Sequence, residues 1–453
     1  MSLPTYPGYK DSGVDWLGTV PEHWDSKRLK FLFDLVKREI REEDRIVTCF
    51  RDGAVTLRDN RRTDGFTNAV KEIGYQGIRV GDLVIHAMDA FAGAIGVSDS
   101  DGKSTPVYSV CTPVSPSVSS NYYARLLRNM AVAGFVSSLA KGIRERSTDF
   151  RWADAGEIFL PVPSETEQRK IVSFLDHETA RIDALIEEQR RLIELLKEKR
   201  QAVISHAVTK GLDPTVPMKD SGVEWLGEVP AHWAVSPLKF LVEEKVAGPY
   251  GASLTKSMYT DSGYRVYGQQ QIISDDFAIG DYYISEEKFS EMQRYVVFPG
   301  DVLVSVMGTI GRVSVVPVGV EVGIINPRLV RYKFASSKVV PEFVKILLMS
   351  LRYQSRLREE SQGSTMEGLN MAILGDLPLV SPPLDTQYSI VAFVKNYDSN
   401  FNELVSQATS AVDLLQERRS ALISVAVTGK IDVRGWQPPT RAQAPESLEV
   451  EAV

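Results

Sequence analysis

Basic and amide side chains gather in a few turns of this chain, and these residue types bind nucleic acid. Lys, Arg, hydroxyl groups and backbone N–H groups contact phosphates, whereas Arg and the amides of Gln and Asn hydrogen-bond to base edges. We therefore take these turns as candidate DNA-binding sites. In the first half of the chain the candidates are Arg58, Arg61 and Arg62, followed by Lys141, Arg144, Arg146, Ser147 and Arg151.

The second half of the chain offers a different set of candidates. Those for phosphate contact are Lys256, Arg328 and Lys333, together with the late-loop residues Gly363, Ser364 and Thr365. Those for base contact are Tyr264, Arg265, Tyr267, Gln269, Gln270 and Gln271. Gln bonds adenine and Arg bonds guanine in a bidentate manner. For each residue the alternative is an ordinary solvated side chain, and the three glutamines could equally form a polar turn.

The net charge does not by itself favour nucleic acid. The chain has 52 Lys and Arg against 59 Asp and Glu, a formal charge of −7. An acidic chain must bind DNA through local basic patches. The hydrophobic fraction of 43% and the charged fraction of 25% are typical of a globular protein.

Motifs for catalysis are missing from the sequence. It contains no Gly-x-Gly-x-x-Gly and no methyl-transfer motif of the Asn-Pro-Pro-Tyr type, since residues 326–328 lack the aromatic side chain. Residues 96–104 approach a P-loop, but the spacing is wrong and Asp99 and Asp101 would place negative charge against a phosphate. We predict a hairpin turn there. We also predict no catalytic residue and no cofactor in this chain.

Histidines and cysteines give no sign of a metal site. None of the five histidines forms a metal-binding pair, and we interpret His23 and His232 as packing residues. Cys49 and Cys111 are too few for a disulfide framework, so reduced thiols are expected. The first residues lack the apolar core of a signal peptide, and no stretch approaches about 18 apolar residues. These features predict a cytoplasmic protein.

The chain is a tandem repeat. Residues 10–24 (KDSGVDWLGTVPEHW) and 219–233 (KDSGVEWLGEVPAHW) agree at twelve of fifteen positions. A second pair of similar segments, 198–213 and 417–432, lies at the far ends of the two halves. Between them the halves diverge, apart from short matches such as a Gly-Asp pair in each. Two copies of one scaffold with different recognition surfaces would give this pattern, and so would a duplicated domain whose middles drifted.

Each half also contains a long helical pattern. Residues 168–208 show heptads with apolar seam positions and charged outer positions, and the second half repeats the pattern. The predicted coiled-coil seam consists of Ile171, Leu175, Ile182, Leu185, Leu192, Leu196 and Val203 in the first helix and Ile390, Val394, Phe401, Leu404, Leu415 and Leu422 in the second. Each helix must bury its stripe, and the simplest solution is an antiparallel pair related by a pseudo-two-fold axis.

The segments between the repeats combine short β-rich runs with one helical stretch each, which predicts two mixed α/β globules. The fold class is therefore α+β, with two globules joined by two long antiparallel helices. The expected organisation is a repeat segment (1–24), a first globule (25–163), a central helix (164–212), a second repeat segment (213–233), a second globule (234–383), a distal helix (384–432) and a disordered tail (433–453).

These residues resemble a known family. The segment Gly-Val-x-Trp-Leu-Gly-x-Val-Pro-x-His-Trp at the start of both copies is similar to specificity subunits of type I restriction–modification systems (the HsdS family), as are the Gly-Asp strands. The helix starts at 163–175 and 382–394 resemble the family's Pro-Pro-Leu-acidic-Glu-Gln run, with departures at 162–164 and at Thr386, where Glu is missing. The resemblance spans about residues 6–432.

The resemblance implies a non-catalytic subunit in a prokaryotic cytoplasm. Each globule would be a target-recognition domain that reads one half of a bipartite double-stranded DNA target. The coiled coil would set the unread gap and bind methyltransferase subunits, and a motor–nuclease subunit would join them. S-adenosylmethionine, ATP and Mg are then expected on the partner subunits. The alternative is a two-domain scaffold that binds proteins through its coiled coil without reading DNA.

Overall fold

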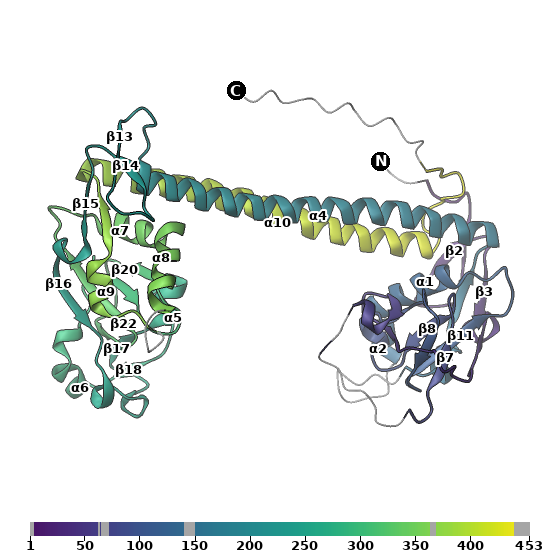
Figure 1. Cartoon of the computed structure of the whole chain (residues 1–453). Coiled ribbons are helices and arrows are strands. Elements are labelled where there is room, and N and C mark those ends of the chain that lie inside the picture. The colour runs from purple at the N-terminus through teal and green to yellow at the C-terminus, as the bar shows by residue number, and fades with distance from the viewer. Residues whose placement is uncertain (1–3, 62–63, 65–71, 140–149, 363–367, 439–453) are drawn as a thin grey trace. The chain divides into compact units, whose positions relative to one another are not determined.

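The structure of the chain is a computed structural model that describes residues 4–61, 64, 72–139, 150–362 and 368–438 (Figure 1). The chain divides into two compact units. The first consists of residues 1–189 with 410–453, and the second of residues 190–409. Among the described residues, no helix has both the length and the apolar character needed to cross a lipid bilayer.

Both units are built on the same antiparallel four-stranded sheet. In the first unit the strand order is β4 (Phe33–Leu35), β11 (Tyr108–Pro113), β8 (Leu83–His86) and β9 (Ile95–Val97). In the second it is β16 (Val242–Ala247), β22 (Leu329–Phe334), β19 (Val302–Ser305) and β20 (Val313–Val315). The Gly-Asp pairs stand before β8 and β19, so these short sequence matches mark equivalent strands.

Shorter elements complete each globule. In the first unit these are β1 (Tyr9–Asp11), β2 (Thr19–Pro21), β3 (Asp25–Arg28), β5 (Val47–Cys49), β6 (Val55–Leu57), β7 (Gln76–Ile78), β10 (Gly102–Ser104), β12 (Phe159–Val162), α2 (Phe135–Leu139) and α3 (Trp152–Ala155). In the second they are β13 (Met218–Asp220), β14 (Glu228–Pro230), β15 (Ala234–Pro237), β17 (Tyr264–Tyr267), β18 (Tyr283–Ile284), β21 (Gly323–Ile325), β23 (Pro378–Ser381), α5 (Gln269–Ser274), α6 (Glu286–Glu291), α8 (Leu351–Gln362) and α9 (Met371–Asp376).

One helix in each globule is tied to the start of a long helix by a buried glutamine. Helix α1 (Ser120–Val132) follows Ser119, whose N–H donates to Oε1 of Gln168 at 2.8 Å. Helix α7 (Pro341–Met349) follows Val340, whose N–H donates to Oε1 of Gln387 at 2.8 Å. Both amides are buried and also donate to a carbonyl beside the start of the long helix. The glutamine that both helix starts share therefore fixes each long helix on its globule.

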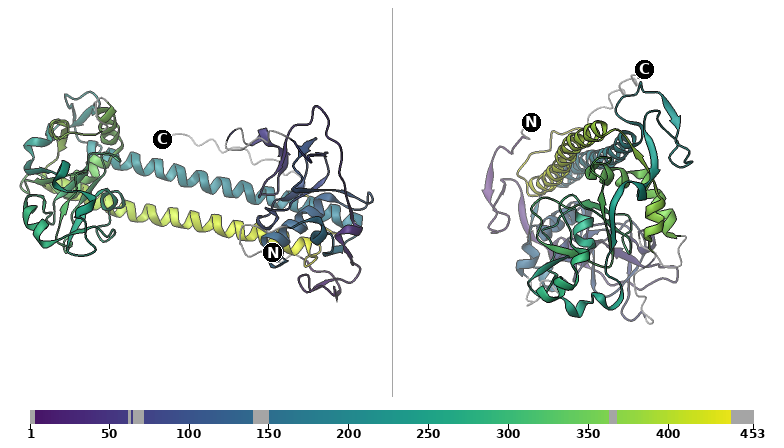
Figure 2. Two further views of the ribbon diagram at one scale, coloured as in Figure 1. Left: turned by 90° about the horizontal axis from the view of Figure 1, so that it is seen from below. Right: turned by 90° about the vertical axis from the view of Figure 1, so that its left-hand side faces the viewer.

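The two long helices are α4 (Glu165–Lys210) and α10 (Leu384–Val427), and each runs without a break (Figure 2). They are antiparallel within each unit. In the second unit Arg200 pairs with Asp398 at 2.7 Å, while the later α4 residues Ala207 and Val208 share a core with the earlier α10 residue Ile390. The prediction of two mixed α/β globules joined by two long antiparallel helices is confirmed.

The predicted seam is wrong at three positions. Leu185, Leu192 and Leu404 are 38%, 43% and 50% exposed, whereas their neighbours Ile186, Ile193 and Val405 are buried or half-buried. The first turns of each helix pack in a globular core, where buried positions such as 171, 175 and 179 recur every four residues. The apolar stripe of the helix is therefore displaced by one position before the heptad spacing begins. The other predicted seam residues are buried or half-buried, as expected for a seam.

The repeat segments cover the opposite ends of the long helices. In the first unit Trp24 is fully buried against Gly429, just beyond the end of α10, and the N–H of Asp432 donates to the carbonyl of Pro4 at 2.7 Å. In the second unit Trp233 is buried against Gly211, just beyond the end of α4. The near-identity of the two repeat segments thus reflects one packing solution used twice.

A carboxylate distinguishes the two helix starts. Glu167 accepts hydrogen bonds from Trp24 Nε1 at 3.2 Å and from Ser164, and lies 2.9 Å from His23 Nε2. His23 is therefore a hydrogen-bonding residue as well as a packing residue. Threonine replaces this glutamate in the second copy, at position 386, and Trp233 Nε1 is buried there without a partner among the described residues. The absence of this glutamate from the second helix start therefore leaves a buried indole N–H without an acceptor among the described residues.

We predict that Glu167→Thr destabilises the first unit by about 1–3 kcal/mol, because it leaves the Trp24 indole N–H buried without an acceptor. Thr386→Glu should stabilise the second unit by supplying the missing acceptor. Urea unfolding followed by tryptophan fluorescence checks both, and Thr386→Gln, which offers an uncharged acceptor, is the control.

The same site sets a pH dependence. Burial opposes ionisation of Glu167, but hydrogen bonds from His23, Trp24 and Ser164 outweigh it and lower the pKa of this carboxyl below its ordinary value. A carboxylate with a lowered folded pKa contributes stability above its unfolded pKa of about 4.3, and the contribution is lost as pH falls through the folded pKa. The difference between wild type and Glu167→Thr should shrink in acid, and a constant difference from pH 7 to 3 would contradict this assignment.

Candidate nucleic-acid interface

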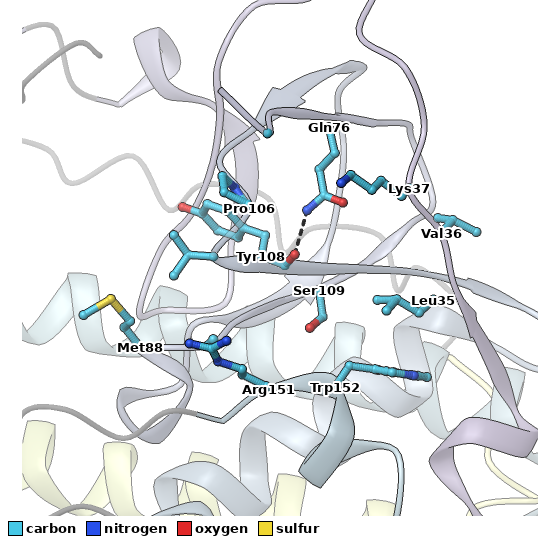
Figure 3. A pocket seen from close by; sticks show the side chains of 13 residues that line it. Leu35, Val36, Lys37, Gln76, Met88, Pro106, Tyr108, Ser109, Arg151 and Trp152 are labelled. Carbon is cyan, nitrogen blue, oxygen red and sulfur yellow. Dashed lines mark hydrogen bonds between the residues drawn. The ribbon is translucent and has the colours of Figure 1, made fainter. Parts of the chain in front are cut away.

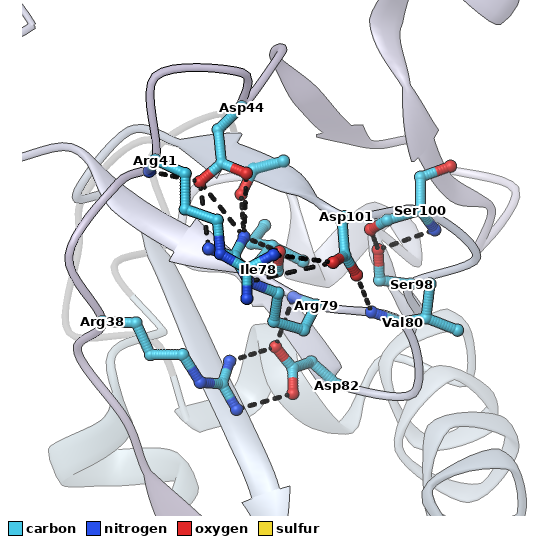
Figure 4. A network of polar contacts seen from close by, with 11 residues as sticks. Arg38, Arg41, Asp44, Ile78, Arg79, Val80, Asp82, Ser98, Ser100 and Asp101 are labelled. Atoms are coloured by element: carbon cyan, nitrogen blue, oxygen red, sulfur yellow. Dashed lines mark hydrogen bonds and ion pairs between the residues drawn. The ribbon is translucent and has the colours of Figure 1, made fainter.

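The P-loop-like segment does not form a hairpin and offers no phosphate cradle. Its two strands belong to different sheets, since β9 pairs with β8 and β10 pairs with β7. Asp101 accepts from the N–H of Val80 at 2.9 Å and pairs with Arg41 at 3.3 Å (Figure 4). Lys103 pairs with Glu72 at 2.7 Å. The predicted hairpin is wrong because long-range pairing separates the two strands, and the charged side chains of the segment are engaged in structural contacts.

The neighbouring Gly-Asp turn is held by arginine. Asp82 accepts the N–H of Arg79 at 2.7 Å and pairs with Arg38, while Arg79 pairs with the buried Asp44 at 3.0 Å (Figure 4). The equivalent Asp301 in the second unit accepts the N–H of Phe298 at 2.8 Å and pairs with Arg331 at 3.1 Å. The repeated aspartates therefore close structural turns.

Part of the predicted first-half interface can be placed in the structure. Arg58 donates to Thr48 at 3.3 Å, and Arg61 pairs with Asp52 at 2.5 Å. Arg151 is exposed and begins the turn of helix α3. Arg62, Lys141, Arg144, Arg146 and Ser147 lie outside the described residues.

A cavity of about 740 Å³ in the first unit is lined in part by Arg151, one of these predicted residues. Gly74 and Arg151 line it, and each follows closely on a segment outside the described residues. Figure 3 shows Gln76 and Lys37 on one side of Tyr108 and Arg151 on the other. This rim offers two cations together with polar and apolar groups, the combination that base edges and phosphates require.

Buried contacts fix the floor of this cavity. The amide of Gln76 is buried and donates to the carbonyl of Tyr108 at 2.7 Å. The Tyr108 ring meets His86 edge-on at 4.6 Å, and burial raises the pKa of its hydroxyl to about 12. The N–H of Phe150 donates to the carbonyl of Ala87 at 3.0 Å and anchors the chain just before Arg151. These contacts hold the floor of the cavity in place, and Lys37 and Arg151 lie at its rim.

Three predicted base-contact residues of the second half are buried, which contradicts their assignment. Tyr267 is fully buried, Gln271 is 3% exposed and Arg265 is 5% exposed. Arg265 donates to two backbone carbonyls at 2.6 and 2.7 Å and to the hydroxyl of Tyr283 at 2.6 Å. Arg265 and Tyr267 lie on β17, the central strand between β18 and β21, and Gln271 lies on α5, where its amide donates to the carbonyl of Ile279 at 2.9 Å. The burial pattern depends on distant strands, so the local sequence did not reveal it.

The other predicted residues of the second half that the structure describes are half-buried or exposed. Tyr264 is half-buried and stacks on Phe289 at 3.8 Å, and Lys333 pairs with Glu243 at 3.4 Å. Lys256 and Gln270 are exposed. Gly363, Ser364 and Thr365 lie outside the described residues.

The structure brings Gln269 and Arg328 together. Oε1 of Gln269 accepts from Nη1 of Arg328 at 3.2 Å, and Nε2 of Gln269 donates to the carbonyl of Met307. Met307 forms an isolated antiparallel β-bridge with Gly368, the first described residue after the predicted loop that contains residues 363–365. Gln269 thus orients the exposed guanidinium of Arg328 beside the predicted loop, and the pair is the best-defined candidate contact of the second half.

Sequence reasoning missed Lys37, Met88 and Tyr108 of the first-half cavity. They lie far apart in the sequence, and the neighbouring strands β4, β8 and β11 bring them together in the fold. A signal was present only in the strand pattern, which places Lys37 two residues after β4. No Arg or Gln run marked them.

The described part of the chain contains no candidate metal centre. Its His, Cys, Asp and Glu residues form no group of three or more that could hold a metal ion. Cys49 and Cys111 are buried free thiols, and burial raises the pKa of both. A buried protonated thiol is a poor nucleophile.

Comparison with known proteins gives one consistent family. Residues 250–413 match the family model described as the type I restriction modification DNA specificity domain. The chain is 24% identical over 300 residues to the EcoBI specificity subunit of Escherichia coli, covering 65% of this chain and 62% of the relative. It is 22% identical over 287 residues to the MjaVIII specificity subunit of Methanocaldococcus jannaschii, covering 61% and 63%. These matches span a little under two thirds of either relative.

Solved structures share the fold. A chain from a structure concerned with complex assembly and conformational transition of the type I restriction–modification system aligns with a TM-score of 0.67 at 16% identity, covering 91% of this chain and 99% of that one. The HsdS subunit of Thermoanaerobacter tengcongensis aligns with a TM-score of 0.53 at 16% identity, covering 91% and 98%. With the duplicated globules and the long helices, these matches show that this chain is similar to the specificity subunits of type I restriction–modification systems and shares the fold of the two solved structures.

Proposed function

We propose that this chain is the DNA sequence-specificity subunit of a type I restriction–modification complex, in which each globule reads one half of a bipartite target. One observation carries the proposal. The two globules share a sheet with the same strand order, yet they present different residues at their rims, Lys37 and Arg151 in one and Gln269 and Arg328 in the other. A common scaffold with different surfaces suits two different half-sites.

Exchange of the first globule tests the proposal. We expect that replacing residues 25–163 with those of a related subunit changes one half of the methylated motif and leaves the other half intact. Methylome sequencing of cells that carry the chimaera and its methyltransferase measures both halves at once. The matched control replaces residues 234–383 and should change the opposite half.

The alternative scaffold function predicts another result. If the chain only binds proteins, neither exchange alters the methylated motif. A change in both halves after a single exchange would also contradict the assignment of one half-site to each globule.

The long helices are proposed to set the unread gap between the half-sites and to bind methyltransferase subunits. The exposed side chains of Leu185, Leu192 and Leu404 support the second role, because leucines that do not serve the seam remain available to a partner. A motor–nuclease subunit would join this assembly. S-adenosylmethionine, ATP and Mg would then be bound by these partners, and this chain would contribute no catalytic group.

Insertion of one heptad into both helices tests the spacing role. Seven residues add about 10 Å of helix, which corresponds to roughly three base pairs of DNA. We expect the methylated motif to keep both half-sites and to change its unread gap by up to about that amount. An insertion of one heptad that leaves the gap unchanged would show that the helices do not determine it.

A further inference from the structure

A polar cavity of about 370 Å³ in the first unit is not explained by the proposed function. Three arginines line it. Arg125 and Arg128 come from α1, and Arg419 comes from α10. Among the described residues that line it, Asp52, in the turn between β5 and β6, is the one acidic side chain. We refer to this space as the arginine cavity.

Two of the three arginines have a carboxylate partner on α4. Arg125 pairs with Asp176, and Arg419 pairs in a bidentate manner with Asp183 at 2.8 and 3.2 Å. Asp52 is also engaged, since it pairs with Arg61 at 2.5 Å. These charges largely compensate one another.

Arg128 differs from its neighbours. Among the described residues, no carboxylate lies within ion-pair distance of its guanidinium, and its buried Nε has no hydrogen-bond partner. Nη2 donates to the carbonyl of Arg51 at 3.3 Å. A side chain at Gly53 would come within 2.7 Å of the Arg128 Cδ, so the glycine makes room for this arginine. The cavity therefore contains a guanidinium that is accommodated but not neutralised.

Electrostatics agrees with this geometry. Burial lowers the pKa of Arg128, nearby Arg419 lowers it further, and Asp52 only partly opposes them. A half-buried cation next to a like charge is costly unless an anion neutralises it.

The second unit shows that the fold does not need these arginines. Ser119 and Val340 make the same hydrogen bond to equivalent glutamines, which fixes the correspondence of α1 and α7. By this correspondence Arg125 and Arg128 are replaced by Ile346 and Met349, which pack against the apolar core. Apolar side chains thus satisfy the same scaffold, so the two arginines of the first unit serve something other than packing.

We propose that the arginine cavity binds one phosphate group, with Arg128 as its principal contact. Guanidinium groups reach the cavity from α1 and α10, and a tetrahedral oxyanion presents acceptors to several donors at once. The phosphate could come from the DNA backbone or from a free anion, and the chemistry of recognition is the same. The proposal does not depend on which bases the globules read.

Inorganic phosphate is the direct probe. Calorimetric titration of the full chain at low salt should show saturable binding at one site, weakened at least tenfold by Arg128→Met, the side chain present at the equivalent position of the second unit. Arg181→Met, which removes one exposed positive charge from α4, is the matched control and should leave phosphate affinity unchanged. Arg128→Gln, which can still donate to the Arg51 carbonyl, replaces the methionine variant if that variant fails to fold.

A second measurement identifies the source of the phosphate. If DNA supplies it, Arg128→Met should lower the salt dependence of DNA binding by about one unit of slope. If a free anion supplies it, the slope stays the same while phosphate binding is lost. Both results support the cavity as a phosphate site. Equal phosphate affinity and equal DNA slope in wild type and Arg128→Met would overturn the proposal, and the half-site exchange above is unaffected by that outcome.

Discussion

Replacing Asp301 by alanine is expected to destabilise the second unit by about 3–5 kcal/mol, because it leaves the Arg331 guanidinium buried without its main partner. Both side chains are 2% exposed, and their atoms approach to 3.1 Å. Arg331 would keep Glu244 at 2.8 Å, a residue that is half exposed. Urea unfolding of the full chain, with hydrogen exchange to locate the unfolding segment, measures the effect.

The first unit contains the matched control. Asp82 occupies the place of Asp301, but its partner Arg38 is 31% exposed and can turn into water when the carboxylate is removed. Asp82→Ala should therefore cost clearly less than Asp301→Ala. Equal costs would show that the turn, and not the buried charge, is what the aspartate stabilises.

A double variant separates the contribution of the ion pair between Asp301 and Arg331 from the cost of burying its two charges. Burial raises the pKa of Asp301 above its ordinary value even though Arg331 lies beside it, so the pair is expensive to desolvate. Val110 stands in the first unit where Arg331 stands in the second. The variant Asp301→Ala with Arg331→Val should recover most of the stability that Asp301→Ala loses, because no charge is left unpaired.

Gly429→Ala is expected to destabilise the first unit by about 3 kcal/mol or more, through left-handed backbone strain and overpacking together. The residue has φ +72°, and an added Cβ would lie 2.6 Å from Pro21 and 2.8 Å from the Trp24 ring. Neither a proline ring nor a buried tryptophan can move aside cheaply. The expected local effect is loss of hydrogen-exchange protection in residues 4–24 and 426–436.

Gly211 separates the two contributions. It also has a positive φ, +86°, but its Cβ would lie 3.3 Å from Trp233, so Gly211→Ala should cost only about 1–2 kcal/mol. Asparagine tolerates the left-handed conformation, so Gly211→Asn should be nearly neutral while Gly429→Asn stays costly. If the two asparagine variants behaved alike, the close contact with Trp24 would not be the cause.

The functional residues show how far sequence reasoning reaches. Residue type identifies Arg328 and Gln269 as candidates, and the structure places them in contact, with the Arg328 side chain exposed. Arg265, which has the same type and lies near them in the sequence, is inside the globule, where its guanidinium donates to the carbonyls of residues 278 and 279 and to the hydroxyl of Tyr283. Residue type identifies candidates, but the side of the strand and its distant partners decide which candidates reach solvent.

The helices show the same division at another scale. Their length and polarity follow from local periodicity, since neighbouring turns interact within a few residues of sequence. The seam at Leu185 and Leu192 was misplaced by one position, because the first turns pack on a globule and shift the stripe before the heptads begin.

The sequence by itself determined the duplication, the two long helices, the α/β character of the globules and the family resemblance. All of these depend on short segments and their spacing, which are encoded locally. Only the tertiary structure decided that the repeat segments cover opposite helix ends, that Glu167 holds Trp24, that Lys37 meets Arg151 around one cavity, and that Arg128 has no carboxylate partner in the described part of the chain. These features join residues far apart in the chain, so they depend on how the strands pair and pack.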